Sequence, residues 1–341
     1  MEIIENACIF EKDMKIKKII TRRFRESDNA YQLVFEWEDI FKTCLGASFS
    51  IDFNLLGMVN RLGKLYSYLP LTTRKPALIF EMNPCYRWTP FNNRPNIVTL
   101  LVDFYYRDEA DLQSFYKAYN RNRLVLVSSA EVYEYLLSVK CPLPIEHLAL
   151  SISDKYRISP ETRFSKQFDV LLMGRQNPVL QSFLDKYVQS HPDLLVVSCR
   201  KEKGHWNYYD RFNRFYGCAD TREGCMDLLR KSRIGLFSTK GMDGDHGPEN
   251  LAYHGFSQVT PRLLEYMVTG NHVLTRYANN ADTRFYELEK MFKNILCYED
   301  FELEMNKALS TDVDMAAYSH YLEKHYTSVR VKQLLSIIEK L

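Results

Sequence analysis

The chain has 341 residues, more than a single hydrophobic core usually organises, so we expect two domains. Its 45 Lys and Arg residues against 43 Asp and Glu residues leave a formal charge of +2, which gives no electrostatic footprint for duplex nucleic acid and argues against a nucleic-acid partner. A hydrophobic fraction of 46% predicts a well-filled globular interior.

The eight cysteines are scattered, with no Cys-x-x-Cys pair and no Cys/His cluster at zinc spacing. This usage predicts reduced thiols and no bound metal. No apolar run approaches the roughly 18 residues that a membrane-spanning helix needs. The mixed acidic and apolar N-terminus lacks the pattern of a signal peptide. We therefore predict a cytoplasmic protein.

The first part of the chain alternates short apolar runs with stretches of helical periodicity. The predicted elements are a strand at 16–21, a helix from Asp28 or Asn29 to Leu45, a strand at 49–51, a helix at 55–66, strands at 77–80 and 96–102, a helix at 108–119, a strand at 124–127, a helix from Ser128 or Ser129 to Val139, and a strand at 145–148. Such alternation predicts an α/β fold with a doubly wound parallel sheet, and we assign residues 1–150 to one domain.

The apolar periodicity lapses at 151–167, a polar stretch that contains Pro160, which we interpret as a linker. The alternation then resumes. We predict strands at 168–173, 194–198, 234–237 and 271–275, helices at 179–190, 222–231 and 260–269, and tail helices at 299–309, 312–325 and 328–341. The second α/β domain would span 168–310, followed by C-terminal helices at 311–341.

The helix at 260–269 has the clearest boundaries. Thr260 is its expected N-cap, Pro261 its first residue and Gly270 its stop. The helix follows a long polar loop at 238–260, so its first N–H groups are available to an anion. Arg262 lies in the first turn and Glu265 one turn later, on the same side.

The pattern Arg-x-x-Glu-x-x-x-x-Gly from Arg262 to Gly270, followed by a strand, resembles the donor-binding helix of GT-B glycosyltransferases, especially the bacterial group related to spore-coat maturation enzymes. The resemblance implies two Rossmann-like domains facing across a cleft, with the last helices crossing back to the first domain. It also implies that Glu265 binds the nucleotide ribose. The common GT-B form has a second glutamate eight residues earlier, where this chain has Ser257, so its sugar recognition must differ.

Two loops supply further donor-binding candidates. Gly174 and Arg175 follow the strand at 168–173 and resemble the Gly-Arg element of GT-B enzymes, where the arginine meets a phosphate. Lys240, in the loop after 234–237, is the expected partner of the diphosphate. The same loop carries three residues that can contact sugar hydroxyls, Asp243, Asp245 and His246, and the segments 199–202 and 215–217 are candidates for contact with the base. The alternatives are a solvated turn arginine, a mobile loop, a metal site in Asp-Gly-Asp-His, and a plain surface pair of Glu265 with Arg262.

Two residues of the first domain are candidate catalytic bases. An inverting transfer needs a base near the acceptor hydroxyl. Asp103 lies just past the strand at 96–102, and His147 lies in the strand at 145–148. The alternative interpretation makes Asp103 a turn or cap residue and His147 a structural histidine.

The expected function is transfer of a sugar from a nucleotide-diphosphate sugar to a glycan, a lipid-linked or another acceptor in polysaccharide biosynthesis, with no metal or other cofactor. The alternatives are a nucleotide-sugar epimerase, a non-catalytic nucleotide- or glycan-binding protein of this fold, and a transferase acting on nucleic acid. Five basic tail residues could support weak contact with the inner face of a membrane, unless they form a solvated helix face: Lys324, His325, Arg330, Lys332 and Lys340.

Overall fold

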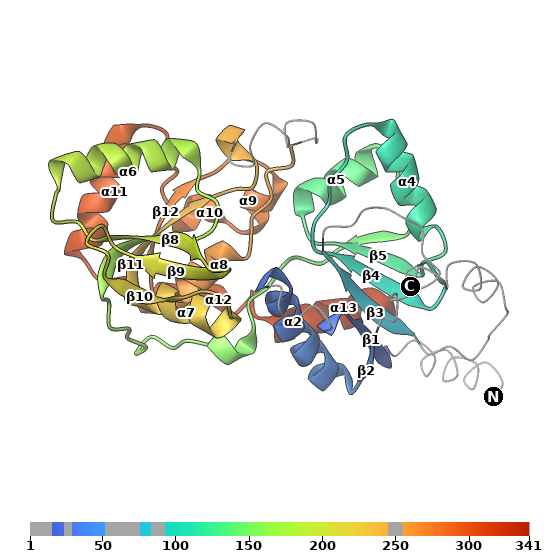
Figure 1. Cartoon of the computed structure of the whole chain (residues 1–341). Helices are drawn as coiled ribbons and strands as arrows, with labels where there is room; N and C mark the ends of the chain where they lie inside the picture. The colour runs from blue at the N-terminus through green and yellow to red at the C-terminus, as the bar shows by residue number, and fades with distance from the viewer. Residues whose placement is uncertain (1–15, 24–28, 52–75, 83–92, 245–254, 341) are drawn as a thin grey trace, which may run out of the picture. The chain divides into compact units, whose positions relative to one another are not determined.

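The computed structural model describes residues 16–23, 29–51, 76–82, 93–244 and 255–340 (Figure 1). The predicted helix at 55–66 and two candidates for sugar contact, Asp245 and His246, lie outside these residues. Within the described part, no helix is both long and apolar enough to cross a membrane.

The chain forms two compact units, each built on its own six-stranded sheet. Unit 1 comprises Met1–Ser153 together with Thr327–Leu341, and unit 2 comprises Asp154–Tyr326. The stretch interpreted as a linker is therefore divided at Ser153. Its remainder belongs to unit 2, where it includes the short 3-10 helix η2 (Asp154–Tyr156) and buries Tyr156 and Ile158.

The sheet of unit 1 is parallel throughout, with the strand order β2-β1-β3-β4-β5-β6. Its strands are β1 (Lys18–Thr21), β2 (Ser48–Ile51), β3 (Ala77–Glu81), β4 (Ile97–Leu101), β5 (Leu124–Val127) and β6 (Ile145–His147). Every residue of β3, β4 and β5 is buried, as the continuous apolar runs predict for strands covered on both faces.

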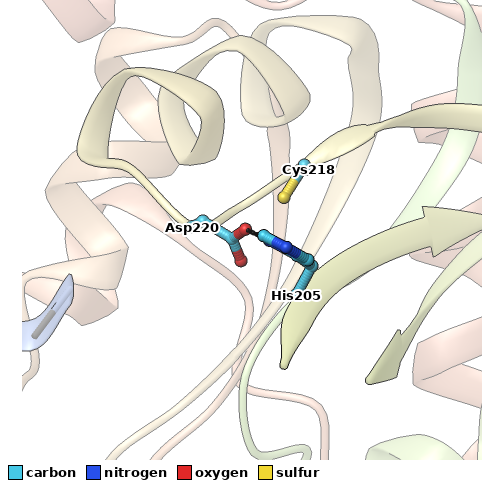
Figure 2. A group of neighbouring side chains, drawn as sticks. All are labelled: His205, Cys218 and Asp220. Atoms are coloured by element: carbon cyan, nitrogen blue, oxygen red, sulfur yellow. Dashed lines mark hydrogen bonds and ion pairs between the residues drawn. The ribbon is translucent and has the colours of Figure 1, made fainter. Parts of the chain in front are cut away.

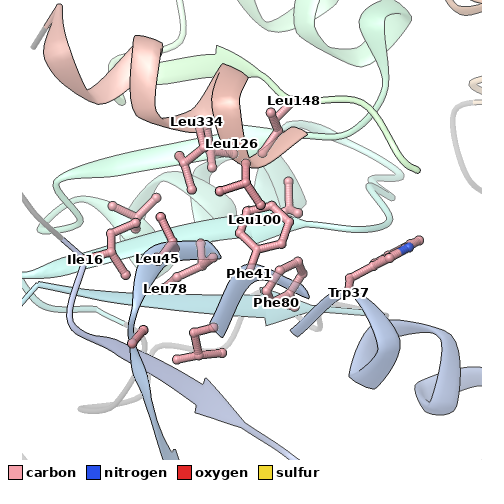
Figure 3. Close-up of a cluster of buried hydrophobic side chains, with 14 of the residues drawn as sticks. Ile16, Trp37, Phe41, Leu45, Leu78, Phe80, Leu100, Leu126, Leu148 and Leu334 are labelled. Atoms are coloured by element: carbon pink, nitrogen blue, oxygen red, sulfur yellow. The ribbon is translucent and has the colours of Figure 1, made fainter. Parts of the chain in front are cut away.

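Among the described residues of unit 1, four helices lie on the two faces of this sheet (Figure 1). They are α2 (Asn29–Leu45), α4 (Glu109–Tyr119), α5 (Ala130–Ser138) and α13 (Thr327–Glu339). Figure 3 shows the core between one face of the sheet and α2 and α13, where Phe41 and Leu334 meet Leu100 and Leu126. Two helices begin where predicted and are capped by side chains, because Asp108 accepts from the N–H of Asp111 and Ser129 from that of Val132.

Helix α13 is fixed to the segment that follows β6. The buried guanidinium of Arg330 donates to the carbonyl of Ala149 at 3.0 Å, and the N–H of Thr327 donates to the carbonyl of Ile152 at 2.9 Å. Arg330 and His325 are each only 2% exposed. The expectation that these two residues face a membrane is therefore wrong, because both are buried in the protein.

A buried carboxyl group in unit 1 makes its stability depend on pH. Glu38 on α2 is 2% exposed and accepts a hydrogen bond from the hydroxyl of Thr21 at 2.5 Å. Burial raises the pKa of Glu38 from 4.5 to about 7, although Thr21 and the Arg23 guanidinium oppose the shift. Between these two pH values the folded protein binds more protons than the unfolded chain, so stability falls as the pH rises.

As the pH rises from 4.5 to 7, we expect the ionisation of Glu38 to lower the free energy of unfolding by roughly 3 kcal/mol. Urea denaturation at pH 5 and pH 8 measures the change. Glu38→Gln should make the protein less sensitive to this pH step than the wild type, whereas Glu134→Gln, at an exposed position on α5, should leave the sensitivity unaltered. An equal pH dependence in Glu38→Gln and wild type would refute the assignment.

The sheet of unit 2 has the order β10-β9-β8-β7-β11-β12 and combines parallel and antiparallel strands. Its strands are β7 (Phe168–Leu172), β8 (Val196–Glu202), β9 (His205–Tyr209), β10 (Phe215–Cys218), β11 (Ser232–Ser238) and β12 (His272–Arg276). The antiparallel pair β9–β10 was not predicted. Strand β8 continues to Glu202 and reverses into β9 through Lys203 and Gly204, both of which have positive φ, as tight hairpins require, and β9 then reverses again into β10.

Within the described residues, unit 2 has seven helices. They are α6 (Pro178–Ser190), α7 (Arg222–Lys231), α8 (Arg262–Val268), α9 (Ala281–Phe285), α10 (Leu288–Met291), α11 (Tyr298–Ser310) and α12 (Met315–Leu322). Helices α6 and α11 pack on one face, where Leu184 and Phe301 join the core with Val170 and Leu236. Helices α7, α8 and α12 lie on the other face (Figure 1).

Candidate functional site

The predicted donor-binding residues of unit 2 gather at the carboxyl ends of its parallel strands. The loop 173–177 follows β7, and the loop that begins at Thr239 follows β11. Helices α7 and α8 each begin at this edge, because each precedes a strand that runs parallel to β7. Open α/β sheets bind ligands at such an edge.

The loop between β7 and α6 exposes Gly174 and Arg175. Gly174 has φ +76°, and a Cβ atom placed there would have no neighbour within 4 Å. The loop is closed by Asn177, whose side-chain oxygen caps α6 by accepting from the N–H groups of Val179 and Leu180, each at 3.0 Å. Arg175 therefore extends from a rigid turn with its side chain in solvent.

The described part of the loop after β11 is fixed at both sides by polar contacts. Arg276 donates to both oxygens of Asp243, at 2.6 and 3.0 Å, and Asn177 donates to the same carboxylate at 2.9 Å. These contacts hold the pKa of Asp243 below its usual value, chiefly through the hydrogen bond from Arg276. The N–H of Lys240 donates to the carbonyl of Gln258 at 2.9 Å and closes the base of the loop. Asp243 thus orders the loop, and Lys240 lies half-buried where the loop begins.

Helix α8 begins later than its sequence suggests. Its first residue is Arg262, Pro261 occupies the N-cap position, and no side chain makes a capping hydrogen bond. The prediction that Thr260 caps the helix is therefore wrong. Thr260 is half-buried, and its carbonyl oxygen accepts from the N–H of Leu263 at 3.3 Å. Pro261 has no N–H group to donate, so the hydrogen-bonded turn from Thr260 to Leu263 leads the chain into the helix.

The centre of the site is a buried group of three charged residues, here named the Arg-Glu-Arg cluster: Arg222, Glu265 and Arg262. One carboxylate oxygen of Glu265 accepts from Arg222, and the other lies 3.1 Å from Nη1 of Arg262. The side chains of Arg222 and Glu265 are 10% and 4% exposed, and that of Arg262 is 29% exposed. Two guanidinium groups against one carboxylate leave a formal charge of +1 in a largely buried place.

Electrostatics keep this cluster charged. Burial would raise the pKa of Glu265, yet Arg222 and Arg262 together hold that pKa below its ordinary value. Arg262 is the member that reaches toward the β7–α6 loop, since its Nη1 lies 3.1 Å from the sulfur of Met173. The cluster therefore joins the start of α7, the start of α8 and the first loop of unit 2.

Arg222 is the site residue that sequence reasoning missed. It is the first residue of α7, after the capping residue Thr221, and it lies 43 positions before Glu265. No pattern along the chain connects the two residues. The fold brings them together because α7 and α8 pack side by side on one face of the sheet.

The two candidate bases lie in unit 1. Asp103 follows β4 and is half-buried. His147, the last residue of β6, is also half-buried and has its ring centroid 6.1 Å from that of Tyr133. Burial lowers the pKa of His147 to about 4, so its imidazole is neutral at physiological pH and a weak base. The segments suggested for base contact, 199–202 and 215–217, lie in the strands β8 and β10.

Comparison with known proteins decides the fold. No family model matches the chain, and no curated protein matches its sequence. Among solved structures, the glycosyltransferase from Rickettsia africae ESF-5 aligns over 95% of this chain and 98% of its own, with a TM-score of 0.53 and 11% sequence identity. The chain has the GT-B fold.

A second GT-B structure agrees. HepE from Anabaena, solved in complex with UDP and glucose, aligns over 96% of this chain and all of its own, with a TM-score of 0.54 and 9% identity. The GT-B resemblance inferred from Arg262, Glu265 and Gly270 is thus confirmed at the level of the fold. At such identity the likeness establishes architecture alone.

Proposed function

We propose that this protein is a glycosyltransferase that uses a nucleotide-diphosphate sugar as donor. The observation that carries the proposal is the Arg-Glu-Arg cluster, which keeps a net positive charge at the ligand-binding edge of a GT-B fold. A diphosphate brings negative charge, and this charge grows as the bond to the sugar breaks. Cations that are already in place stabilise that transition state without reorganising.

The described residues suggest a division of roles. Arg262 is the partly exposed member of the cluster, and Arg175 and Lys240 lie in the two neighbouring loops, so these three would contact the diphosphate. Their charges would serve in place of a metal ion at the leaving group. Glu265 would hold Arg222 and Arg262 in position. Its contact with ribose hydroxyls stays a prediction, since both of its oxygens already have arginine partners.

The acceptor side of the reaction also stays a proposal. Asp103 follows β4 and His147 ends β6, so both lie at the carboxyl ends of strands in unit 1, and both stay candidates for a general base. A glycan or lipid-linked acceptor, as in polysaccharide biosynthesis, fits the proposed donor chemistry.

A thermal-shift panel tests the donor proposal. UDP, GDP, CDP, TDP and their sugars are added to the wild type, to Arg175→Gln, and to the control Arg284→Gln, at an exposed position on α9. One of the nucleotides, at a concentration about a hundred times its dissociation constant, should stabilise the wild type and the control by about 2.7 kcal/mol. Arg175→Gln should show a smaller shift because a phosphate contact is lost.

Two outcomes would count against the proposal. If no nucleotide raises the melting temperature of the wild type, the interpretation of this edge as a donor site is wrong. If a nucleotide sugar binds but is neither hydrolysed nor transferred to any acceptor, the protein is a non-catalytic nucleotide-sugar binder.

A further inference from the structure

Three residues with metal-binding side chains meet at the hairpin of unit 2. His205 begins β9, Cys218 ends β10, and Asp220 lies just before α7. Their ligand atoms all lie within 4.8 Å of one another. Figure 2 shows the imidazole, the thiol and the carboxylate pointing toward a common space. We propose that this group, here named the hairpin triad, binds a zinc ion.

The backbone around the hairpin triad is held in place by close contacts. The N–H of Trp206 donates to one oxygen of Asp220 at 2.7 Å, and the N–H of Ala219 donates to the carbonyl of Trp206 at 2.8 Å. The first turn of α7 approaches so closely that a Cβ atom at Gly224 would lie 2.2 Å from the carbonyl oxygen of Cys218. Strand β9, the end of β10 and the start of α7 therefore form one rigid frame.

The carboxylate of Asp220 is oriented for a ligand. The bond from Trp206 occupies Oδ1, and Oδ2 is directed at Nδ1 of His205. A metal ion between Oδ2 of Asp220 and Nδ1 of His205 would replace the proton that these atoms share. The N–H of Trp206 would remain bonded to Oδ1 as an outer contact. Such outer contacts orient the ligands of metal sites.

The ligand chemistry favours zinc. A thiolate, an imidazole and a carboxylate are the three donor types that zinc accepts, and the thiolate disfavours Mg²⁺ and Ca²⁺. Bonds of about 2.0–2.3 Å in a tetrahedron place ligand atoms about 3.5 Å apart. The side chain of His205 is exposed, and its rotation would bring the ligand atoms to this spacing. Water would take the fourth position.

The zinc ion would connect the hairpin to the donor site. Asp220 lies two residues before Arg222, so a metal that clamps the hairpin to the start of α7 would also restrain that arginine. The metal itself would be structural and would not contact the diphosphate. The proposal therefore stands on the hairpin triad and is independent of the proposed transfer reaction.

Cobalt provides the test, because Co²⁺ occupies zinc sites and a Co²⁺–thiolate bond gives a charge-transfer absorption band. The reduced full-length protein is treated with chelator, desalted and titrated with Co²⁺. We expect one equivalent to produce the band and Zn²⁺ to abolish it. Cys218→Ser should lose the band, and Asp220→Asn, which can still accept from Trp206, should bind Co²⁺ at least tenfold more weakly.

Cys297→Ser, which alters an exposed cysteine far along the chain, is the matched control and should keep the full band. A wild-type protein that gives no band, or a band that persists in Cys218→Ser, would overturn the proposal. Because Asp220→Asn removes a ligand charge and keeps the backbone contact, unchanged Co²⁺ affinity in this variant would also overturn it.

Discussion

Replacing Glu265 by alanine is expected to lower the free energy of unfolding by about 3–5 kcal/mol. The side chain of Glu265 is 4% exposed, and its carboxylate is the shared partner of Arg222 and Arg262. Removing the carboxylate leaves the guanidinium groups of Arg222 and Arg262 close together with no negative charge between them. The guanidinium of Arg222 is also largely buried. Chemical denaturation followed by fluorescence should show the loss in the transition of unit 2.

Two further variants show whether charge or packing causes the loss. Glu265→Gln keeps the shape of the side chain and should also be strongly destabilised if charge dominates. Glu289→Ala, at an exposed position on α10, should stay within about 0.5 kcal/mol of the wild type. Glu265→Ala with wild-type stability would show that the Arg-Glu-Arg cluster does not hold α7 and α8 together.

Changing Arg262 to glutamine is expected to reduce kcat/KM for sugar transfer by about 10²–10³-fold. Arg262 is the member of the cluster with the most exposed side chain, and it reaches the β7–α6 loop through Met173. A cation that stabilises the leaving diphosphate acts mainly in the transition state, so kcat should fall more than KM rises. Steady-state kinetics, with the donor found in the thermal-shift panel, measures the separate changes in kcat and KM.

The fold should tolerate this change, because Glu265 keeps its ion pair with Arg222 when Arg262 is lost. A melting temperature close to that of the wild type would verify this. Arg284→Gln serves as the control and should transfer sugar at the wild-type rate. Full activity in a stable Arg262→Gln protein would remove Arg262 from the proposed mechanism.

Much of the fold follows from local sequence pattern. The buried strands β3, β4 and β5 are continuous apolar runs, and the caps at Asp108 and Ser129 lie where the periodicity begins. The hairpin of β9 and β10 escaped prediction because its strands are short, rich in aromatic residues and partly exposed, so they have no clear apolar period. The Lys203–Gly204 turn connects β8 to β9, so in the sequence it marks only where β9 begins.

The contacts within the Arg-Glu-Arg cluster were predictable only where its residues are neighbours on one helix. Arg262 and Glu265 are three residues apart, so their contact follows from helical geometry. Arg222 comes from another helix, and its contact depends on how α7 and α8 pack. The hairpin triad shows the same limit, because His205 and Cys218 become neighbours only when β9 pairs with β10.

The return of α13 to unit 1 has a consequence for biosynthesis. Unit 2 is one uninterrupted segment, Asp154–Tyr326, and is synthesised completely before residue 327. Unit 1 is interrupted, and Val331, Leu334 and Ile338 belong to its core. During synthesis on the ribosome, the core of unit 1 is therefore begun before that of unit 2 but completed after it. Until α13 has been translated, the face of the unit 1 sheet that it will cover needs protection from other chains.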